Sequence, residues 1–210
     1  MSALIILILG FFLSGCAPVM YRVQVTGYSQ PGAGVQLSPA AAYCVIDNRE
    51  AKDPVLEKEI KGKIEKLLGI KGYIITAFEQ ADYYLVFSYG QGQARTVSVP
   101  LPPYGPWGYG GRWQPYPFAP IPDYYSLPPV QRVYDRWLLV NVIEGPRYRE
   151  KGEFQRVWLG EARSTGYSPN LRATMNFLLV ALFEDFGKST GRGRVVEVEQ
   201  EDFRAQELWR

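Results

Sequence analysis

The side chains that most often carry catalysis are scarce in this sequence of 210 residues. It contains no histidine and two cysteines. Without imidazole there is no Ser-His-Asp triad, no Cys-His pair and no common catalytic zinc site. Catalysis would have to depend on carboxylates, Lys, Tyr or a Ser-Lys pair. The composition therefore predicts a protein without catalytic residues, without cofactors and without a metal site.

Cys16 stands at the end of a short apolar segment. Residues 5–12 are uncharged and apolar, and Leu13, Ser14 and Gly15 connect them to the cysteine. A membrane-spanning helix needs roughly 20 apolar residues, so this run is too short to cross a bilayer comfortably. Its length is typical of the central region of a secretory signal, although the usual Lys or Arg before that region is absent. An uncleaved anchor helix and a buried core helix are the alternatives.

The sequence Leu13-Ser14-Gly15-Cys16 resembles the lipobox of bacterial lipoproteins. The resemblance implies cleavage between Gly15 and Cys16 and diacylation of the cysteine thiol, which makes Cys16 the first mature residue. One acyl chain holds a protein on a membrane only marginally, whereas two hold it firmly. In lipoproteins of this type, Asp after the cysteine indicates retention in the inner membrane, and this chain has Ala17. The expected location is the outer membrane of the cell envelope, facing the periplasm.

The second cysteine and the net charge argue against two further kinds of function. With Cys16 acylated, Cys44 has no disulfide partner within the chain, and its neighbours Tyr43 and Val45 favour a small buried strand residue over a reactive thiol. The formal net charge is +2. Such a small excess gives no electrostatic case for binding nucleic acid.

Two glycine-containing segments look like nucleotide-binding motifs but lack essential parts. Gly187-Lys188-Ser189-Thr190 matches the end of a phosphate-binding loop, yet Leu182 stands where the leading glycine is needed. This segment also follows an expected helix, whereas a phosphate-binding loop opens one. Gly90-Gln91-Gly92-Gln93 lacks the third glycine and the following helix, which favours a bend or bulge in a strand. Neither segment predicts a nucleotide site.

Residues 100–130 form an insertion rich in proline, glycine, tyrosine and tryptophan. Proline cannot donate to a sheet ladder or continue a helix, so this segment is expected to be extended, polyproline-like or disordered. Aromatic rings offer a large contact area at low entropic cost. Trp107, Tyr109, Trp113 and Tyr116 are therefore candidate contacts for a partner protein, a glycan or a lipid headgroup. The alternative is a low-complexity loop that folds over its own domain or stays mobile.

The periodicity of the remaining sequence predicts the domain organisation. The expected parts are a signal peptide (1–15), a flexible tether (16–41), a single α+β domain (42–186) interrupted by residues 100–130, and a charged C-terminal tail (187–210). Within the tether, residues 21–25 alternate like a short strand, and residues 195–198 do the same within the tail.

Two amphipathic helices are expected in the domain. The first begins at Asp53-Pro54, a cap followed by proline, and closes at Gly69. Its apolar stripe comprises Leu56, Ile60, Ile64 and Leu67, and its exposed side carries the pairs Glu57 with Lys61 and Glu59 with Lys63. The second helix starts at Ser168-Pro169 and runs to about Phe186, with a broader apolar face.

The expected strands form a mixed sheet of five or six strands covered by these two helices. They are residues 42–47, 72–77, 81–89 with a continuation to 99, 133–143 and 156–163. The first of them, the first helix and the second strand imply a right-handed parallel crossover. The last two are expected to form an antiparallel hairpin joined by a polar turn at 145–152.

Several of these segments, together with the lipobox, look like bacterial envelope lipoproteins that are known only under a domain-of-unknown-function label. The segments are Ala81-Asp82-Tyr83-Tyr84-Leu85-Val86, Trp158-Leu159-Gly160-Glu161-Ala162 and Leu178-Leu179-Val180-Ala181-Leu182-Phe183-Glu184-Asp185-Phe186. The resemblance covers roughly residues 42–186 without the insertion. It implies an α+β domain on a lipid anchor and supplies no catalytic residues. Independently of it, Trp158 and Gly160 have structural explanations, as an inward ring and as a close approach to a helix.

The expected function is therefore binding or structural support at the outer membrane, with a membrane contact through the acyl chains on Cys16. A carboxylate-dependent hydrolase of cell-wall glycan is one rival, and it requires two carboxyl groups about 5 to 9 Å apart in a cleft. An accessory subunit of an envelope transport or assembly complex is another, and it would present a large exposed apolar patch.

Overall fold

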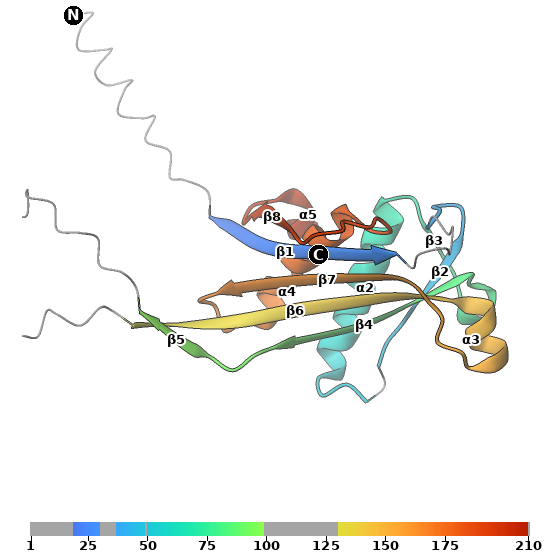
Figure 1. Cartoon of the computed structure of the whole chain (residues 1–210), viewed down its shortest axis with the longest axis horizontal. Coiled ribbons are helices and arrows are strands. Elements are labelled where there is room, and N and C mark those ends of the chain that lie inside the picture. Colours follow the sequence, from blue (N-terminus) through green and yellow to red (C-terminus); the bar gives the residue numbers. More distant parts are fainter. Residues whose placement is uncertain (1–18, 30–36, 49, 99–129, 210) are drawn as a thin grey trace, which may run out of the picture.

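The computed structural model of the chain describes residues 19–29, 37–48, 50–98 and 130–209. These residues form an open mixed sheet of eight strands with helices mainly on one face (Figure 1). The strands are β1 Met20–Ser29, β2 Ala42–Ile46, β3 Ile74–Ile75, β4 Tyr83–Gln91, β5 Arg95–Ser98, β6 Val130–Glu144, β7 Arg156–Gly166 and β8 Arg194–Glu199. The helices are α2 Pro54–Ile70, the 3-10 turn η1 Phe78–Gln80, α3 Gly145–Lys151, α4 Leu171–Glu184 and α5 Phe203–Glu207. The predicted α+β class is confirmed, and the sheet has more strands than the five or six expected.

The sheet is mixed because the pairs around β2 are parallel and the pairs among the other strands are antiparallel. The strand order is β3-β2-β4-β6-β7-β1-β8, and β5 pairs with the first residues of β6. β2 runs parallel to β3 and β4, and the other pairs are antiparallel. The parallel pairing of β2 and β3 across α2 agrees with the crossover expected from the sequence. β6 and β7 are antiparallel neighbours, as expected, with Val140 opposite Gly160.

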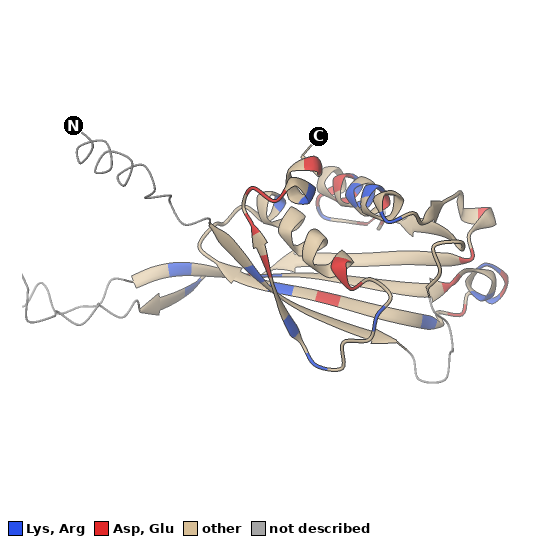
Figure 2. Cartoon of the chain, turned by 90° about the horizontal axis from the view of Figure 1, so that it is seen from above, with Lys and Arg blue, Asp and Glu red and all other residues tan. Residues whose placement is uncertain are grey.

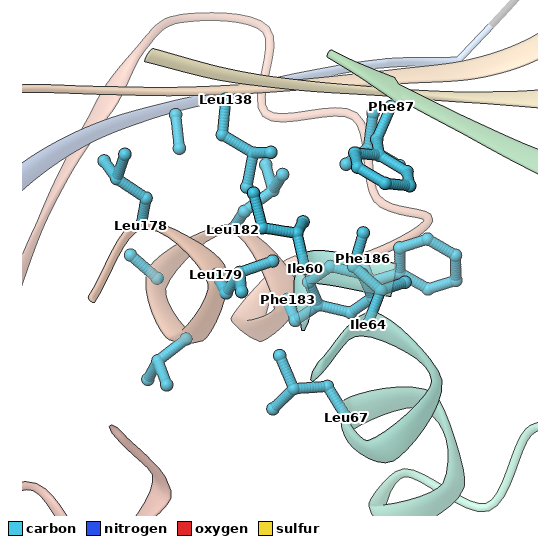
Figure 3. Packing of buried hydrophobic residues seen from close by; sticks show 14 of the residues in the cluster. Ile60, Ile64, Leu67, Phe87, Leu138, Leu178, Leu179, Leu182, Phe183 and Phe186 are labelled. Atoms are coloured by element: carbon cyan, nitrogen blue, oxygen red, sulfur yellow. The ribbon is translucent and has the colours of Figure 1, made fainter. Parts of the chain in front are cut away.

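Helices α2, α4 and α5 lie on one face of the sheet (Figure 2). The main hydrophobic core fills the space between them and the inward side chains of the strands. Figure 3 shows Ile60, Ile64 and Leu67 of α2 near the α4 side chains, with Phe87 and Leu138 pointing to them from the sheet. The opposite face, called the helix-free face below, is covered at one end by α3, where Tyr148 packs against Tyr84.

The start of α2 follows the predicted capping pattern. Asp53 Oδ1 accepts hydrogen bonds from the backbone amides of Val55 and Leu56, at 3.1 and 2.9 Å, and proline occupies the first helical position. The helix extends one residue past the expected end at Gly69. Gly72, with φ of 81°, makes the turn that follows, because a left-handed backbone suits a residue without a side chain.

One of the two ion pairs expected along α2 is present. Lys63 Nζ lies 2.5 Å from Glu59 Oε1. Glu57 is instead buried, and its carboxylate accepts a hydrogen bond from the backbone of residue 48 at 2.8 Å. Lys61 pairs with Asp47 at 3.0 Å. The expectation for Glu57 was wrong because its face of the helix turns toward β4 and the loop before the helix.

Two segments expected to lie outside the domain belong to the sheet. β1 lies between β7 and β8, within the segment expected to be a flexible tether, and buries Val23 and Val25. β8 buries Val196 and Val198, and α5 then packs against α4, within the segment expected to be a charged tail. Each of these strands buries little apolar surface by itself. The strands are held in the sheet by the pairing of β1 with β7 and β8, which are more than 100 residues away in the sequence.

Three local boundaries also differ from expectation. The expected polar turn at 145–152 contains helix α3, which Arg149 holds to the sheet end by donating from Nη1 to the carbonyl oxygen of Ala81 at 2.6 Å. α4 begins at Leu171, because the Asn170 side chain caps it by accepting from the amide of Ala173 at 3.0 Å. The long strand expected over 81–99 is two strands, β4 and β5, which pair with successive parts of β6.

Candidate functional site

The site residues expected from the sequence lie outside the described residues. They are the lipidation and cleavage residues Gly15 and Cys16, and the candidate partner contacts Trp107, Tyr109, Trp113 and Tyr116. In the part of the chain that the structure describes, no helix combines the length and the hydropathy of a membrane span. The structure does establish where the segments that carry these residues join the sheet.

Both segments join the same end of the sheet, called the Met20 end below (Figure 1). β1 begins at Met20 and runs antiparallel to β7 with Gln24 opposite Arg163, so its first residues lie toward the Gly166 end of β7. Tyr134 of β6 is also opposite Gly166. The insertion joins the ribbon of β5 and β6, which extends beyond this point and ends with Ser98 opposite Val130.

Two adjoining hollows, each of about 390 Å³, lie at the Met20 end. The face hollow is lined by Arg22, Gln24, Asp135, Arg136, Trp137, Arg163, Ser164, Thr165 and Val195. The end hollow is lined by Val19, Met20, Tyr21, Arg22, Arg136, Ser164, Thr165, Gly166, Tyr167 and Ser168. Both linings include Arg22, Arg136, Ser164 and Thr165. Figure 2 shows basic residues on the strands in this region.

Arg136 is a buried cation, with 2% of its surface exposed. Arg136 is two residues before the core residue Leu138 in β6. Because alternate side chains of a strand point to the same face, Arg136 lies on the helix side of the sheet. Its Nη2 donates to the carbonyl oxygen of Gly166 at 3.2 Å and to that of Ser168, just before α4. Its Nε has no hydrogen-bond partner, and the guanidinium forms no ion pair within the described residues. Burial lowers the pKa of Arg136 from its usual value, and the nearby Tyr21 and Asp135 oppose that effect.

Asp135 connects three strands on the other side of the sheet. Its carboxylate accepts from Arg95 Nε and Nη2 at 3.0 and 3.1 Å and from Thr165 Oγ1 at 2.5 Å. The hydrogen bonds from Thr165 and Arg95 lower the pKa of Asp135. This arrangement joins β5, at the root of the insertion, to β6 and β7.

Trp137 forms one wall of the face hollow and is 38% exposed. Gly90 of β4 lies opposite it, and a Cβ at Gly90 would come within 2.6 Å of the indole ring. Gly90 itself continues the ladder between β4 and β6, and the expected bend or bulge lies just after it, at residues 92–94. Gln91 is opposite Arg136 and Arg95 is opposite Val133, so between these pairs the β4–β5 side has one residue more than β6. Gly90 leaves space for the ring of its cross-strand neighbour.

The described residues supply little for catalysis at this end. Asp135 is the one carboxylate among the lining residues of the two hollows. Glu161 is on the same face but lies opposite Leu139, four residues along β6 from Asp135, which corresponds to about 13 Å along a strand. That spacing is wider than the pair required for glycoside hydrolysis. Among the described residues, no group of three or more acidic or cysteine side chains is placed to hold a metal ion.

Cys44 is less buried than expected. It lies on the helix-free face of β2, half-buried beside Ile46 and Val86. Burial raises the pKa of the Cys44 thiol. Because the thiolate is the nucleophile, a raised pKa disfavours the reactive-thiol alternative.

A larger hollow of about 650 Å³ lies at the opposite end of β1. It is lined by Tyr28, Ser29 and residues 154–159, and both Tyr28 and Phe154 are about half exposed, at 49% and 50%. Arg156 is the only charged residue among the described residues that line it. This hollow offers an apolar surface, whereas the hollows at the Met20 end offer cations and hydroxyl groups.

Comparison with known proteins gives likenesses in fold only. No protein-family model matches the chain, and no curated protein does. A PDZ domain protein from Parabacteroides distasonis ATCC 8503 is 12% identical, with a TM-score of 0.47, over 87% of this chain and 40% of that one. The PelC dodecamer from Paraburkholderia phytofirmans is 13% identical, with a TM-score of 0.40, over 77% and 91% of the two chains. A DUF4136 family protein from Bacteroides thetaiotaomicron VPI-5482 is 15% identical, with a TM-score of 0.39, over 77% and 92%. The chain thus spans less than half of the PDZ domain protein, and at these scores the likenesses carry no argument about function.

Proposed function

We propose that the chain is a lipid-anchored protein of the bacterial cell envelope, held at the outer membrane by acyl chains on Cys16, and that its sheet acts there as a binding or structural module. One observation carries the proposal. Val19, the first described residue, follows Cys16 by three residues and lies at the same end of the sheet as the root of the aromatic insertion (Figure 1).

The short connection determines what an anchor at Cys16 would do. Three residues reach at most about 11 Å in a fully extended chain. Acyl chains on Cys16 would therefore keep the Met20 end of the sheet close to the bilayer surface. Val19, Val130 and Tyr167 at this end are 59%, 67% and 64% exposed. Trp and Tyr are favoured at the interface between bilayer and water, which suits an aromatic insertion that leaves the domain at this end.

Mass spectrometry of the mature amino terminus tests the anchor directly. The full chain is produced with a C-terminal tag in a bacterium with two membranes, beside Cys16→Ser and the matched variant Cys44→Ser. We expect the wild type and Cys44→Ser to begin at a diacylated Cys16 and to sediment with outer membranes. Cys16→Ser should lose both properties. An intact, unacylated amino terminus on the wild-type protein would contradict the proposal.

The apolar hollow at the far end of β1 favours a second candidate function, an accessory subunit of an envelope complex. Tyr28 and Phe154 are large side chains that no element of the described chain covers fully. Crosslinking in cells with Tyr28→Ser and Phe154→Ser combined should then recover fewer envelope proteins than the wild type. Equal recovery would exclude this surface as the contact.

A further inference from the structure

The end hollow combines a buried cation with an excess of hydrogen-bond donors. Among the described residues, its charged lining residues are Arg22 and Arg136, and none of the described lining residues is a carboxylate. Ser164, Ser168 and Tyr21 are lining residues that carry hydroxyl groups, whereas the hydroxyl of the lining residue Thr165 already donates to Asp135. Hydroxyl groups and guanidinium groups together are the donors that proteins use to hold phosphate oxygens.

Arg136 is the residue that makes this hollow unusual. A buried cation is normally paired with an anion, because removing a charge from water is costly. Arg136 has instead two carbonyl oxygens of the segment before α4, and its Nε lacks an acceptor. The described chain therefore supplies fewer acceptors, and less negative charge, than this guanidinium can use.

Gly166 leaves space for the guanidinium in this position. A Cβ at Gly166 would lie 3.1 Å from Arg136 Nη1. Arg22 is held less firmly, since its side chain is 79% exposed and its pair with Glu197, at 2.9 Å, is a surface ion pair. Such pairs contribute little to stability, so Arg22 can exchange its partner for a ligand at small cost.

From these contacts we propose that the end hollow binds a phosphate group, with Arg136 and Arg22 as the cationic contacts and the hydroxyl groups of Ser164, Ser168 and Tyr21 as further donors. Two sources could supply this group, a phospholipid headgroup or a free phosphate. The exposed side chains of Val19, Met20 and Tyr167 at the rim favour the headgroup, because an apolar rim suits the glycerol and acyl region next to the phosphate. The choice of headgroup rests on the proposed function, because an anchor at Cys16 brings this end to the bilayer.

The test measures binding to the full-length protein in a maltoside detergent and a buffer without phosphate. Dihexanoyl phosphatidylglycerol, inorganic phosphate and dihexanoylglycerol are titrated separately, and the shift in thermal unfolding gives the affinity. The variants are Arg136→Gln and Arg22→Gln. Arg163→Gln is the matched control, because Arg163 lies at the same end but lines the face hollow and not the end hollow.

We expect phosphatidylglycerol to stabilise the wild type and dihexanoylglycerol to have no effect. Arg136→Gln and Arg22→Gln should each weaken binding at least tenfold, whereas Arg163→Gln should stay within twofold of the wild type. If Arg136→Gln does not fold, Arg22→Gln decides the outcome, since its side chain is on the surface. Equal affinity for inorganic phosphate would support the site and assign it to the free anion.

Two results would overturn the inference. One is no stabilisation of the wild type by either phosphate compound. The other is an equal loss of affinity in Arg163→Gln, which would indicate general attraction to a basic surface. Repeating the titration with Cys16→Ser separates this inference from the anchor. If Cys16→Ser still binds phosphatidylglycerol, the phosphate site is supported whether or not the chain is acylated. If the acylated wild type does not bind, the anchor is supported and the phosphate site is contradicted.

Discussion

At Gly160 a single missing Cβ determines how the sheet meets a helix. A Cβ there would collide with the ring of Trp158 and would come within 2.9 Å of Leu182 Cδ1 on α4. The indole of Trp158 is 2% exposed, and its Nε1 donates to the carbonyl oxygen of Lys188 at 2.9 Å. The ring is therefore fixed by packing and by a hydrogen bond, and it cannot move aside without loss.

Gly160→Ala should lower the free energy of unfolding by about 1–3 kcal/mol, the usual cost of overpacking a core. Gly62→Ala is the matched control, because Gly62 is an exposed residue of α2 whose added Cβ has no heavy atom within 4 Å. That substitution should raise the free energy of unfolding by about 0.5–1 kcal/mol through helix propensity. Urea denaturation followed by circular dichroism measures both. A Gly160→Ala protein as stable as the wild type would show that the Trp158 ring can shift freely.

Asp135→Asn should loosen the β5 strand at the root of the insertion. The charged carboxylate accepts from Arg95 and Thr165, and the change removes the ion pair, at a cost of about 0.5–1 kcal/mol for a surface pair. Hydrogen exchange at the amides of Thr96 and Val97 should become faster. Glu161→Gln, which removes the partner of Arg163 on β7, should leave β5 unchanged.

The lowered pKa of Asp135 determines how the connection between β5, β6 and β7 depends on pH. Because the pKa of Asp135 is lowered in the folded protein, its stabilisation is present above the usual carboxyl pKa of about 4 and is lost as the pH falls below it. Exchange in β5 should therefore be insensitive to this group between pH 5 and 8. A transition in that range, abolished by Asp135→Asn, would contradict the assignment.

At the scale of elements, the buried Tyr43 and the half-buried Tyr89 connect the sheet to the helix layer. The pKa of Tyr89 is raised to about 12, first by burial and then by the carboxylate of Glu57 in α2, to which Tyr89 is hydrogen bonded. Burial, followed by Tyr73 and Tyr83, also raises the pKa of Tyr43 in β2. Both phenols must remain neutral while the helix layer is packed on the sheet.

The protein should therefore lose stability in alkali. A raised folded-state pKa gives stability that is fully present below the unfolded value of about 10 and is lost as the pH rises toward the folded value. The free energy of unfolding should fall between pH 10 and 12, and it should fall less steeply in Tyr89→Phe. Urea titrations at a series of pH values measure this. An unchanged slope in Tyr89→Phe would mean that Tyr89 ionises equally in both states.

At the scale of the whole molecule, the arrangement of chain connections gives the sheet two unlike ends. The Met20 end has the first strand, the insertion root and the basic hollows, and the other end has α3 and the apolar hollow (Figure 1). An anchor at Cys16 would therefore orient the molecule as well as retain it.

Orientation can be measured with a fluorophore on single cysteines in a Cys44→Ser background. The acylated protein is placed in vesicles that contain brominated lipids. A label at Tyr167→Cys should be quenched, whereas a label at Glu153→Cys, just before β7 at the other end, should not. Equal quenching of both labels would show that the protein has no fixed orientation on the bilayer.

The insertion itself can be tested in cells. Replacing Trp107, Tyr109, Trp113 and Tyr116 together by Ser should reduce the recovery of crosslinked envelope partners, because the rings are the expected contact area. Replacing four prolines of the same segment by Ser is the control for a change of composition. Unchanged recovery in the aromatic variant would favour a passive loop.

Much of the fold could be predicted because its signals are local. Asp53 and Pro54 begin α2, the apolar spacing after them defines its buried stripe, and the strands on either side have β-branched and aromatic residues. The sheet edges were harder to predict. β1 and β8 have short alternating segments, and what orders them is their pairing with each other and with β7.

The candidate site was less accessible from the sequence. In the sequence, Arg136 is one of several charged residues in an expected strand. Its burial depends on the carbonyl groups of Gly166 and Ser168, which are about 30 residues away in the chain. Its alternation with Leu138 and Val140 is a signal that could have placed it on the buried side. The space that Gly90 leaves for Trp137 had no such signal, because it depends on strand register.

By itself the sequence determined that these 210 residues contain no imidazole, and it predicted many of the local elements. The lack of histidine excludes whole classes of catalysis, and capping and periodicity depend on residues within one or two turns of each other. The lipobox at Cys16 is also a local pattern, and its acylation stays a prediction. Only the tertiary structure decided that the first strand and the insertion root share one end of the sheet, and that a cation is buried beside them. Both are consequences of strand order and register, which bring together residues that are far apart along the chain.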